Sequence, residues 1–369
     1  MGTEIVSEEL PMAAEAVQAP IGRTIERVRR KVDDRLVRFM DSHLSPVDDP
    51  DVIKGYRSLR DFVVDGGKRI RPILCYWGWY GAGGEESEEA SAVSAGAALE
   101  LCHAGLLVHD DVMDGSELRR GRPTVHRGLA GSDPRPAGQD FGRSAAVLLG
   151  VLAQAWADEL LGEVEADSER VHAARSLFNR MRTEVISGQY LDILARLREG
   201  ASVEQALRVA HYKTAKYTVE RPLQIGGALA GAEPPLLDAY SRFGLPLGEA
   251  FQLRDDVLGV FGDTAVTGKP VVDDLREGKQ TALIAYAFAH ASGPQRDRLR
   301  VWHGNPDLDE PHAAVLRQVI VDTGALAHVE ELITRRVGRA LGALREGTIP
   351  ERAREALALL ADRLTHRVL

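Results

Sequence analysis

Residues 106–114 read Leu-Leu-Val-His-Asp-Asp-Val-Met-Asp, an apolar run that ends in three aspartates. In a helix Asp110 and Asp114 lie on one face, one turn apart, and Asp111 and Asp114 share its edge. Carboxylates this close repel one another unless a cation lies between them. Mg²⁺ fits because it takes oxygen ligands and keeps waters and substrate phosphates in its other positions. We therefore interpret this stretch as a metal site at the mouth of an apolar space; the alternative is a solvated acidic helix end.

A second acidic cluster repeats this layout far along the chain. Residues 251–263 read Phe-Gln-Leu-Arg-Asp-Asp-Val-Leu-Gly-Val-Phe-Gly-Asp, with Asp255 and Asp256 inside an apolar helical pattern. Two aspartate-rich helices can face one another across a cavity and hold several Mg²⁺ ions around one pyrophosphate. The pair of clusters is a stronger indication of a metal-assisted diphosphate site than either cluster alone.

A basic turn indicates a separate anion site that needs no metal. Residues 66–72 read Gly-Gly-Lys-Arg-Ile-Arg-Pro, and paired glycines let backbone N–H groups approach a phosphate. Lys68 offers a point charge and Arg71 a planar fork for phosphate oxygens. His103 precedes Asp110 by two helical turns and so shares its face. The alternatives are an ordinary basic surface run and a buried core histidine.

The composition favours a cytoplasmic protein with a large core. The chain has 369 residues, 44% of them hydrophobic, and a formal net charge of −9, which argues against nucleic acid as a partner. Cys75 and Cys102 lie in apolar helical patterns and are expected to be buried free thiols. No stretch of 18 apolar residues is free of charge, so we predict no integral membrane segment.

Helical periodicity organises nearly the whole chain. Residues 1–20 are acidic and Ala-rich, and we expect a disordered tail there. From Gly22 apolar residues recur at helical spacing, strand-like alternation is absent, and no linker divides the chain. Residues 203–230 are expected to form one helix, kinked at Pro222. The sequence thus predicts an all-α fold with a single domain over residues 21–369, its helices surrounding a central cavity.

Together, the two acidic motifs and the basic turn resemble the trans-polyprenyl diphosphate synthase family, which includes geranylgeranyl and farnesyl diphosphate synthases. The resemblance covers roughly residues 22–300. It implies the isoprenoid synthase fold, a homodimer, and a transferase that condenses isopentenyl diphosphate with allylic diphosphates. It also implies roughly two to three Mg²⁺ ions per active site, which Mn²⁺ can replace.

The same resemblance assigns roles to individual residues. It places metal ligands at Asp110, Asp111, Asp114, Asp255 and Asp256. It places contacts to the allylic diphosphate at Arg119, Lys213, Lys269 and Lys279, and contacts to isopentenyl diphosphate at Lys68, Arg71, His103 and Arg120. Thr214 and Gln252 would back the reaction centre, so the expected catalytic set is Asp110, Asp114, Lys213, Thr214, Gln252 and Asp255. Gly259 departs from the family pattern, which often has aspartate there.

Product length is expected to depend on the residues just before the first aspartate. By resemblance Gly105 and its neighbour Leu106 set the floor of the cavity, and small residues there favour a C20 product, geranylgeranyl diphosphate. A C15 or longer product stays open, and Gly105 could instead let another helix pack closely. A class I terpene cyclase would not need Lys68 and Arg71, and a non-catalytic subunit would have lost aspartates of the first motif.

Overall fold

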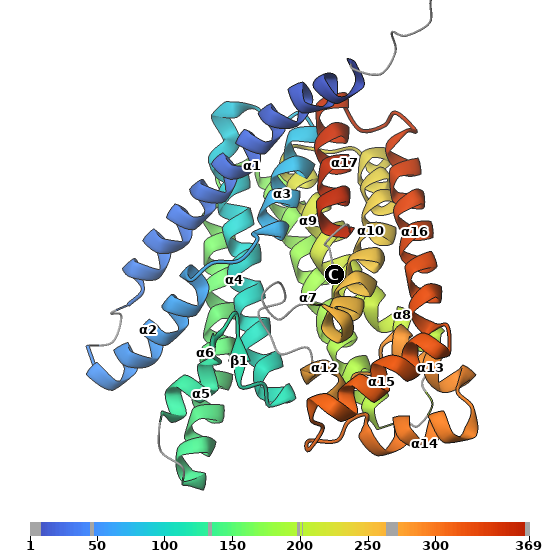
Figure 1. The fold of residues 1–369 in the computed structure, drawn as a ribbon. Helices are drawn as coiled ribbons and strands as arrows, with labels where there is room; N and C mark the ends of the chain where they lie inside the picture. The colour runs from blue at the N-terminus through green and yellow to red at the C-terminus, as the bar shows by residue number, and fades with distance from the viewer. Residues whose placement is uncertain are drawn as a thin grey trace, which may run out of the picture.

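Helices make up nearly all the regular structure in this computed structural model, which describes residues 9–44, 48–131, 135–197, 200, 202–262 and 272–365 (Figure 1). The first half contains α1 (Glu9–Ser42), α2 (Pro50–Val64), α3 (Ile70–Gly81), η1 (Glu86–Glu88), α4 (Glu89–Asp114), α5 (Val125–Ala130), α6 (Pro136–Gly162) and α7 (Ser168–Arg196). The second half contains α8 (Val203–Ala210), η2 (His211–Glu220), α9 (Arg221–Leu229), α10 (Pro234–Phe261), α12 (Asp273–Arg276), α13 (Ala282–His290), α14 (Gly293–Trp302), α15 (Glu310–Asp322), α16 (Ala325–Leu344) and α17 (Glu351–Thr365). The predicted all-α fold is confirmed.

Two helices that carry the acidic motifs form the centre of the packing. Helix α4 packs against α3 and α6, and α10 packs against α16 and η2. Helix α7 packs against both η2 and α9. In Figure 1 these helices run mostly lengthwise, while α1 lies along the outside beside α2 and α3. The ends of α4 and α10 that carry the aspartates are thereby held in one rigid frame.

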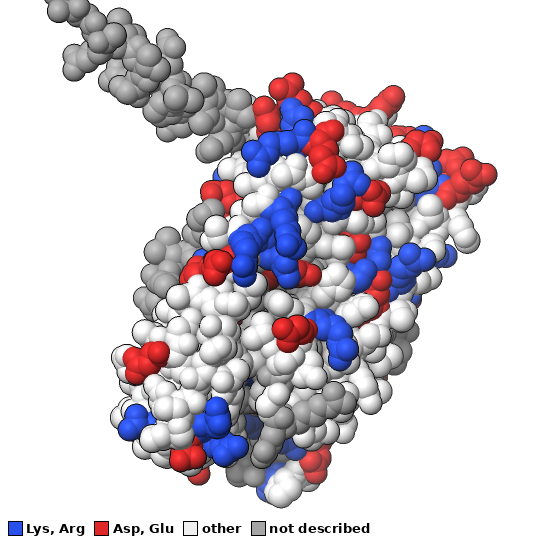
Figure 2. Space-filling model, turned by 90° about the vertical axis from the view of Figure 1, so that its right-hand side faces the viewer, with Lys and Arg blue, Asp and Glu red and all other residues white. Residues whose placement is uncertain are grey.

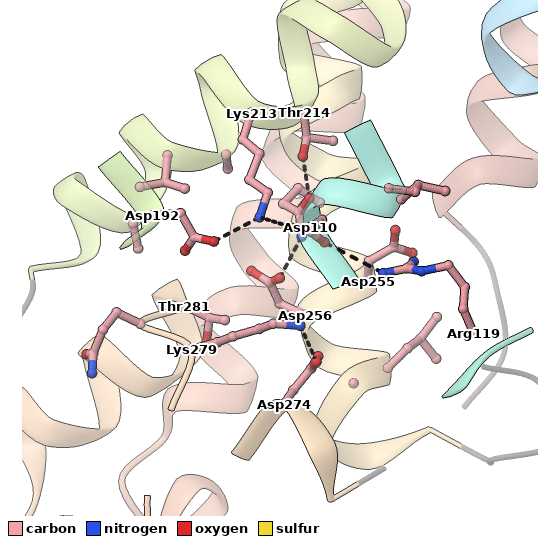
Figure 3. Close-up of a pocket in the computed structure, with 18 of the residues that line it drawn as sticks. Asp110, Arg119, Asp192, Lys213, Thr214, Asp255, Asp256, Asp274, Lys279 and Thr281 are labelled. Atoms are coloured by element: carbon pink, nitrogen blue, oxygen red, sulfur yellow. Dashed lines mark hydrogen bonds and ion pairs between the residues drawn. The ribbon is translucent and has the colours of Figure 1, made fainter. Parts of the chain in front are cut away.

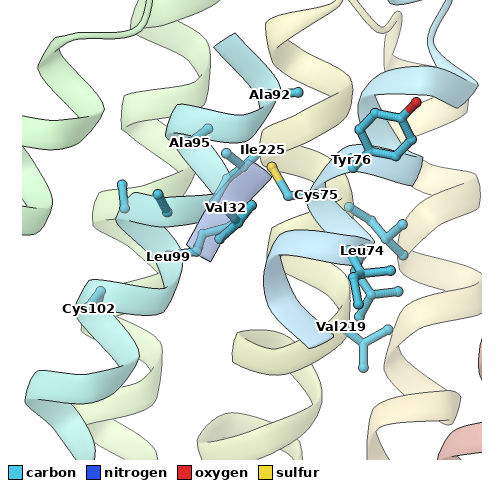
Figure 4. Packing of buried hydrophobic residues seen from close by; sticks show 14 of the residues in the cluster. Val32, Leu74, Cys75, Tyr76, Ala92, Ala95, Leu99, Cys102, Val219 and Ile225 are labelled. Carbon is cyan, nitrogen blue, oxygen red and sulfur yellow. The ribbon is translucent and has the colours of Figure 1, made fainter. Parts of the chain in front are cut away.

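Small and branched side chains interdigitate between the first helices. In Figure 4, Val32 of α1, Cys75 of α3, Leu99 of α4 and Ile225 of α9 meet in one buried cluster. Fully burying a leucine or isoleucine contributes about 1.5–3 kcal/mol. Cys75 and Cys102 are buried and free, as predicted, and burial raises the pKa of each thiol to about 12.

Three local features differ from the sequence-based expectations. Of the tail expected over residues 1–20, residues 1–8 lie outside the described residues, and α1 begins at Glu9, since Leu, Met, Ala and Glu in this stretch all favour helix. The single helix expected over residues 203–230 is divided into α8, η2 and α9, and Pro222 lies in the first turn of α9, where proline is tolerated. A short antiparallel hairpin of β1 (Leu118–Arg119) and β2 (Arg122–Pro123) follows α4.

Charged residues of both signs share the surface. On the face drawn in Figure 2, Lys and Arg side chains stand beside Asp and Glu side chains. Two helices, Glu86–Asp114 and Pro136–Gly162, are long and apolar enough to cross a membrane by length and composition. The first is 78% buried within the fold, as a core helix is, and the second is 44% buried.

Candidate active site

The first acidic motif occupies the last turn of α4. Gly115 ends this helix in the left-handed region, with φ of 66°, and its N–H donates to the carbonyl oxygen of Asp111. The C-terminal end of a helix carries partial negative charge, so three aspartates there concentrate an unfavourable charge. This end of α4 therefore favours cations.

Basic side chains from other segments supply those cations. They form the following pairs: Arg119 Nε donates to both oxygens of Asp111 at 2.8 and 2.9 Å, Arg196 Nη2 to Asp114 at 2.8 Å, and Lys213 Nζ to Asp110 at 3.3 Å. Burial alone would raise the pKa of Asp110, but Lys213, Arg119 and Lys279 hold it below its ordinary value. The carboxylate of Asp110 is thus kept ionised and ready to bind a cation.

Lys213 projects from the π-helix η2 and bridges two helices. Its Nζ donates to Asp192 of α7 at 2.8 Å as well as to Asp110 of α4 (Figure 3). Burial opposes the charge of Lys213, but these two carboxylates raise its pKa above the ordinary value. Stretches of π-helix often occur at functional sites, and here consecutive residues Lys213 and Thr214 both line the pocket.

The second acidic motif lies in the last turns of α10 and faces the same pocket. Thr214 donates to Gln252, and Gln252 Nε2 donates to Asp256 at 2.7 Å, so η2 and α10 are joined through side chains. Burial, with help from the carboxylates of Asp274 and Asp255, raises the pKa of Asp256 to about 7. A cation near Asp256 would relieve this repulsion.

The pocket between the two motifs has a volume of about 430 Å³. Nine residues expected from the sequence line it, namely Lys68, Asp110, Arg119, Lys213, Thr214, Gln252, Asp255, Asp256 and Lys279. Lys269 lies outside the described residues.

Other expected site residues lie beside the pocket. Asp111 is buried against Arg119, and Asp114 pairs with Arg196. Gly105 is buried where α4 meets α6, and Leu106 is partly buried against the core.

Several polar residues at the pocket were not expected from the sequence. Asp192, Asp274, Gln280 and Thr281 line it, and Gln189 Nε2 donates to Asp110 at 3.0 Å. Gln189 and Asp192 belong to a Gly-Gln-Tyr-Leu-Asp run in α7. These two polar residues are three apart and so lie on one edge of the helix, a spacing from which they could have been predicted. Asp274 and Thr281 flank Lys279, which was expected.

The basic turn has the strained backbone that its glycines permit. Gly66 and Gly67 have φ of 99° and 134°, and Arg69 also lies in the left-handed region with φ of 49°. Arg69 is buried and pairs with Asp33 at 2.7 Å and Glu100 at 2.8 Å. Arg69 thus anchors the turn, while its neighbour Lys68 reaches the pocket lining.

Three residues that are expected to bind a second anion lie near this turn, namely Arg71, His103 and Arg120. Arg71 Nη2 donates to Thr218 at 2.8 Å, and the Arg71 guanidinium lies 4.1 Å from the ring centre of Tyr217. The Tyr217 hydroxyl is 2.8 Å from His103 Nδ1. Burial, and then the positive charges of Arg71 and Arg120, lower the pKa of His103 well below its ordinary value. His103 is therefore neutral in a region rich in positive charge, which suits an anionic ligand.

The pocket offers Mg²⁺ the hard oxygen donors that it prefers. Asp110, Asp192, Asp255, Asp256 and Asp274 all line it. Within the described part of the chain, no group of three or more His, Cys, Asp or Glu side chains is placed so that it could hold a metal ion by itself. Mg²⁺ is commonly held by one or two carboxylates plus substrate phosphates, so this donor set fits the ion when a diphosphate is bound.

Comparisons with known proteins agree with this geometry. The polyprenyl synthetase family profile matches residues 55–319. A geranylfarnesyl diphosphate synthase of Aeropyrum pernix is 33% identical over 82% of this chain and 91% of its own length. A (2E,6E)-farnesyl diphosphate synthase of Mycobacterium tuberculosis is 31% identical over 92% of this chain and 89% of its own.

A solved structure gives the same result at the level of the fold. The geranylgeranyl pyrophosphate synthase of Corynebacterium glutamicum, complexed with isoprenyl diphosphate and magnesium, superposes with a TM-score of 0.89 and 39% identity. The alignment covers 93% of this chain and 99% of that one.

Fold and site together define a metal-dependent, all-α enzyme acting on diphosphates. The chain belongs to the polyprenyl synthetase family and is a prenyltransferase that makes polyprenyl diphosphates.

Proposed function

We propose that this prenyltransferase condenses isopentenyl diphosphate with allylic diphosphates and releases mainly geranylgeranyl diphosphate, a C20 product. The observation that carries the proposal is the pair of acidic motifs facing one pocket while a separate basic cluster lies behind the Gly66-Gly67 turn. A terpene cyclase needs the first of these sites but not the second.

The allylic diphosphate would bind at the polar mouth of the pocket. Lys213, Lys279 and Arg119 line it, and each is at present paired with a carboxylate. Their ammonium and guanidinium groups would hold the diphosphate and stabilise the negative charge that grows as it departs. We propose Lys269 as a further contact by the family resemblance alone.

Metal binding is proposed at Asp110, Asp111, Asp114, Asp255 and Asp256. Asp111 also accepts two hydrogen bonds from Arg119, which hold that arginine in place. When bound, Mg²⁺ would supply Lewis-acid stabilisation of the departing diphosphate. We propose two to three ions per site, by the family resemblance. Asp110 of α4 and Asp255 of α10 both line the pocket (Figure 3), which supports their acting on one diphosphate.

Isopentenyl diphosphate would bind without metal at Lys68, Arg71, His103 and Arg120. Arg120 Nη1 donates to the carbonyl oxygen of Gly66 at 2.6 Å, which brings this arginine to the basic turn. The neutral ring of His103 can donate one hydrogen bond without adding charge. Thr214 and Gln252, whose side chains are fixed by mutual hydrogen bonding, would face the carbocation and assist proton loss.

The test is a product assay with purified protein. Isopentenyl diphosphate is mixed with each allylic diphosphate in turn and Mg²⁺, and product length is read by mass spectrometry. A C20 product from farnesyl diphosphate is expected. A cyclised hydrocarbon, or no condensation with any allylic diphosphate, would overturn the proposal, whereas a C15 or longer main product would overturn only the proposed length.

We further propose that the protein is a homodimer formed through an exposed apolar stripe. Phe141, Leu148 and Val151 of α6 are more than half exposed, as are Ile186 and Tyr190 of α7. Large apolar patches of this kind on a folded protein mark interaction sites.

Light scattering is expected to give twice the chain mass, and Leu148→Glu with Val151→Glu should reduce it. Val301→Glu changes an equally exposed valine on α14 and serves as the control. A monomeric wild type would contradict the dimer.

Residues 21–369 are proposed to form one domain. Helix α10 supports this, because Phe251 packs in the first hydrophobic cluster and Leu253 in the second. A cytoplasmic location without a membrane-spanning segment is proposed from the composition, with no nucleic-acid partner, given the net charge of −9.

A further inference from the structure

Position 259 lacks the carboxylate that would complete the second acidic motif. Gly259 follows Asp255 by four residues and so shares its face of α10. A β-carbon built on Gly259 would collide with Oδ2 of Asp274, from the short helix α12. The carboxylate of Asp274 thus occupies the space in which an aspartate side chain at 259 would begin.

Asp274 also points into the pocket. It lines the pocket together with Asp255, Asp256 and Lys279 (Figure 3). Lys279 Nζ donates to Oδ1 of Asp274 at 2.5 Å, which leaves Oδ2 as the oxygen lying over Gly259. The lysine therefore orients the carboxylate toward the second motif.

We propose that Asp274 supplies the third carboxylate of the second acidic motif, as an oxygen ligand for the divalent cation at the Asp255 end of the pocket. The inference rests on the proposed function. It also gives a reason for glycine at position 259, because any side chain there would exclude the Asp274 carboxylate from its present place. The motif then keeps three carboxylates, with one delivered from another helix.

The competing explanation is that Asp274 serves only as the counter-ion of Lys279. The two explanations predict different effects when Asp274 loses its charge. A mere counter-ion would leave metal binding unchanged when Asp274 is neutralised. A ligand would lose metal affinity on its own neutralisation, and a carboxylate returned to the same space from another residue would restore that affinity.

The experiment measures Mn²⁺ binding to the full-length protein in the presence of inorganic diphosphate, by electron paramagnetic resonance titration, so it does not depend on turnover. Asp274→Asn should weaken the binding of one ion by roughly tenfold to a hundredfold. Asp273→Asn is the matched control, since Asp273 precedes Asp274 on α12 but pairs with Arg276.

A charge relocation completes the test. The double variant Gly259→Asp with Asp274→Ala returns the carboxylate to α10, and it should recover most of the affinity lost in Asp274→Asn. Circular dichroism melting verifies that each variant is folded. Wild-type affinity in folded Asp274→Asn, or no recovery in the folded double variant, would overturn the role of Asp274. Failure of wild type itself to bind Mn²⁺ with diphosphate would instead refute the proposed metal site.

Discussion

A β-carbon added to Gly105 would lie 2.9 Å from the carbonyl oxygen of Gly150. Helices α4 and α6 thus meet backbone to backbone five residues before the first aspartate. The same β-carbon would lie 2.8 Å from Nε2 of Gln154, whose amide also donates to the carbonyl of Cys102 at 2.8 Å. In this structure Gly105 serves helix packing, and its influence on product length stays a prediction.

Gly105→Ala is therefore expected to lower the free energy of unfolding by about 1–3 kcal/mol, since the extra methyl overpacks a tight contact. Denaturant unfolding measures the change. Gly338→Ala is the matched control, because Gly338 lies inside helix α16 with open space around it. That control should be neutral or stabilising by about 0.5–1 kcal/mol. A shorter product with unchanged stability in Gly105→Ala would instead place Gly105 at the cavity floor.

Neutralising the first residue of either acidic motif should abolish efficient turnover. Asp110→Ala or Asp255→Ala is expected to lower kcat by about 10²–10³, as the loss of charge stabilisation in a transition state does. Excess chelator should abolish turnover in the wild type. Asp297→Ala, at an exposed position on α14, controls for the loss of a carboxylate. Wild-type rates in either motif variant would contradict the proposed metal ligands.

Separate diphosphate sites predict a selective effect at Arg71. Arg71→Ala is expected to raise KM for isopentenyl diphosphate by about tenfold or more, the cost of one hydrogen bond to a charged group, with a smaller change for the allylic substrate. Arg71→Lys should recover part of the loss, since it keeps the charge but not the planar fork. Arg38→Ala, exposed on α1, is the control. Equal KM changes for both substrates would argue for one shared site.

His303 should make the fold sensitive to mild acid. Its Nε2 lies 3.2 Å from the carbonyl oxygen of Lys279, and burial lowers the pKa of His303 to about 4. The unfolded chain takes up this proton near pH 6.5, before the folded chain does, so stability falls as pH drops from about 6.5 to about 4.

The loss attributable to His303 is at most about 3 kcal/mol. Thermal melting across this pH range measures it, and His303→Gln should flatten the profile. His172→Gln, exposed on α7, should leave the profile as in wild type. An unchanged profile in a folded His303→Gln protein would remove His303 as the cause.

The sequence predicted the parts of the site that repeat a local chemical pattern. Asp110, Asp255 and Lys68 stand in charged runs whose combination predicted a ligand site, and all three line the pocket. The place of Asp274 in the pocket could not be predicted in the same way, because it depends on the space left by Gly259 on another helix. Local periodicity does not encode which helices meet.

The same limit applies to the fold. Helical periodicity from Gly22 onward predicted the helical class of the chain, and the described residues from α1 to α17 bear it out. The division of residues 203–230 did not follow, because a change from α- to π-type hydrogen bonding leaves apolar residues in a plausible helical order.

Because η2 is a π-helix over residues 211–220, the number of residues in this stretch decides where its side chains lie. Since π-type hydrogen bonds join residues five apart and α-type bonds join residues four apart, removing one residue there would let α-type bonding continue into α9. The residues of η2 would then shift relative to one another, so Lys213 and Thr214 would lose their present places beside Asp110, Asp192 and Gln252. A deletion within η2 is therefore expected to disturb the site even where the flanking helices stay packed.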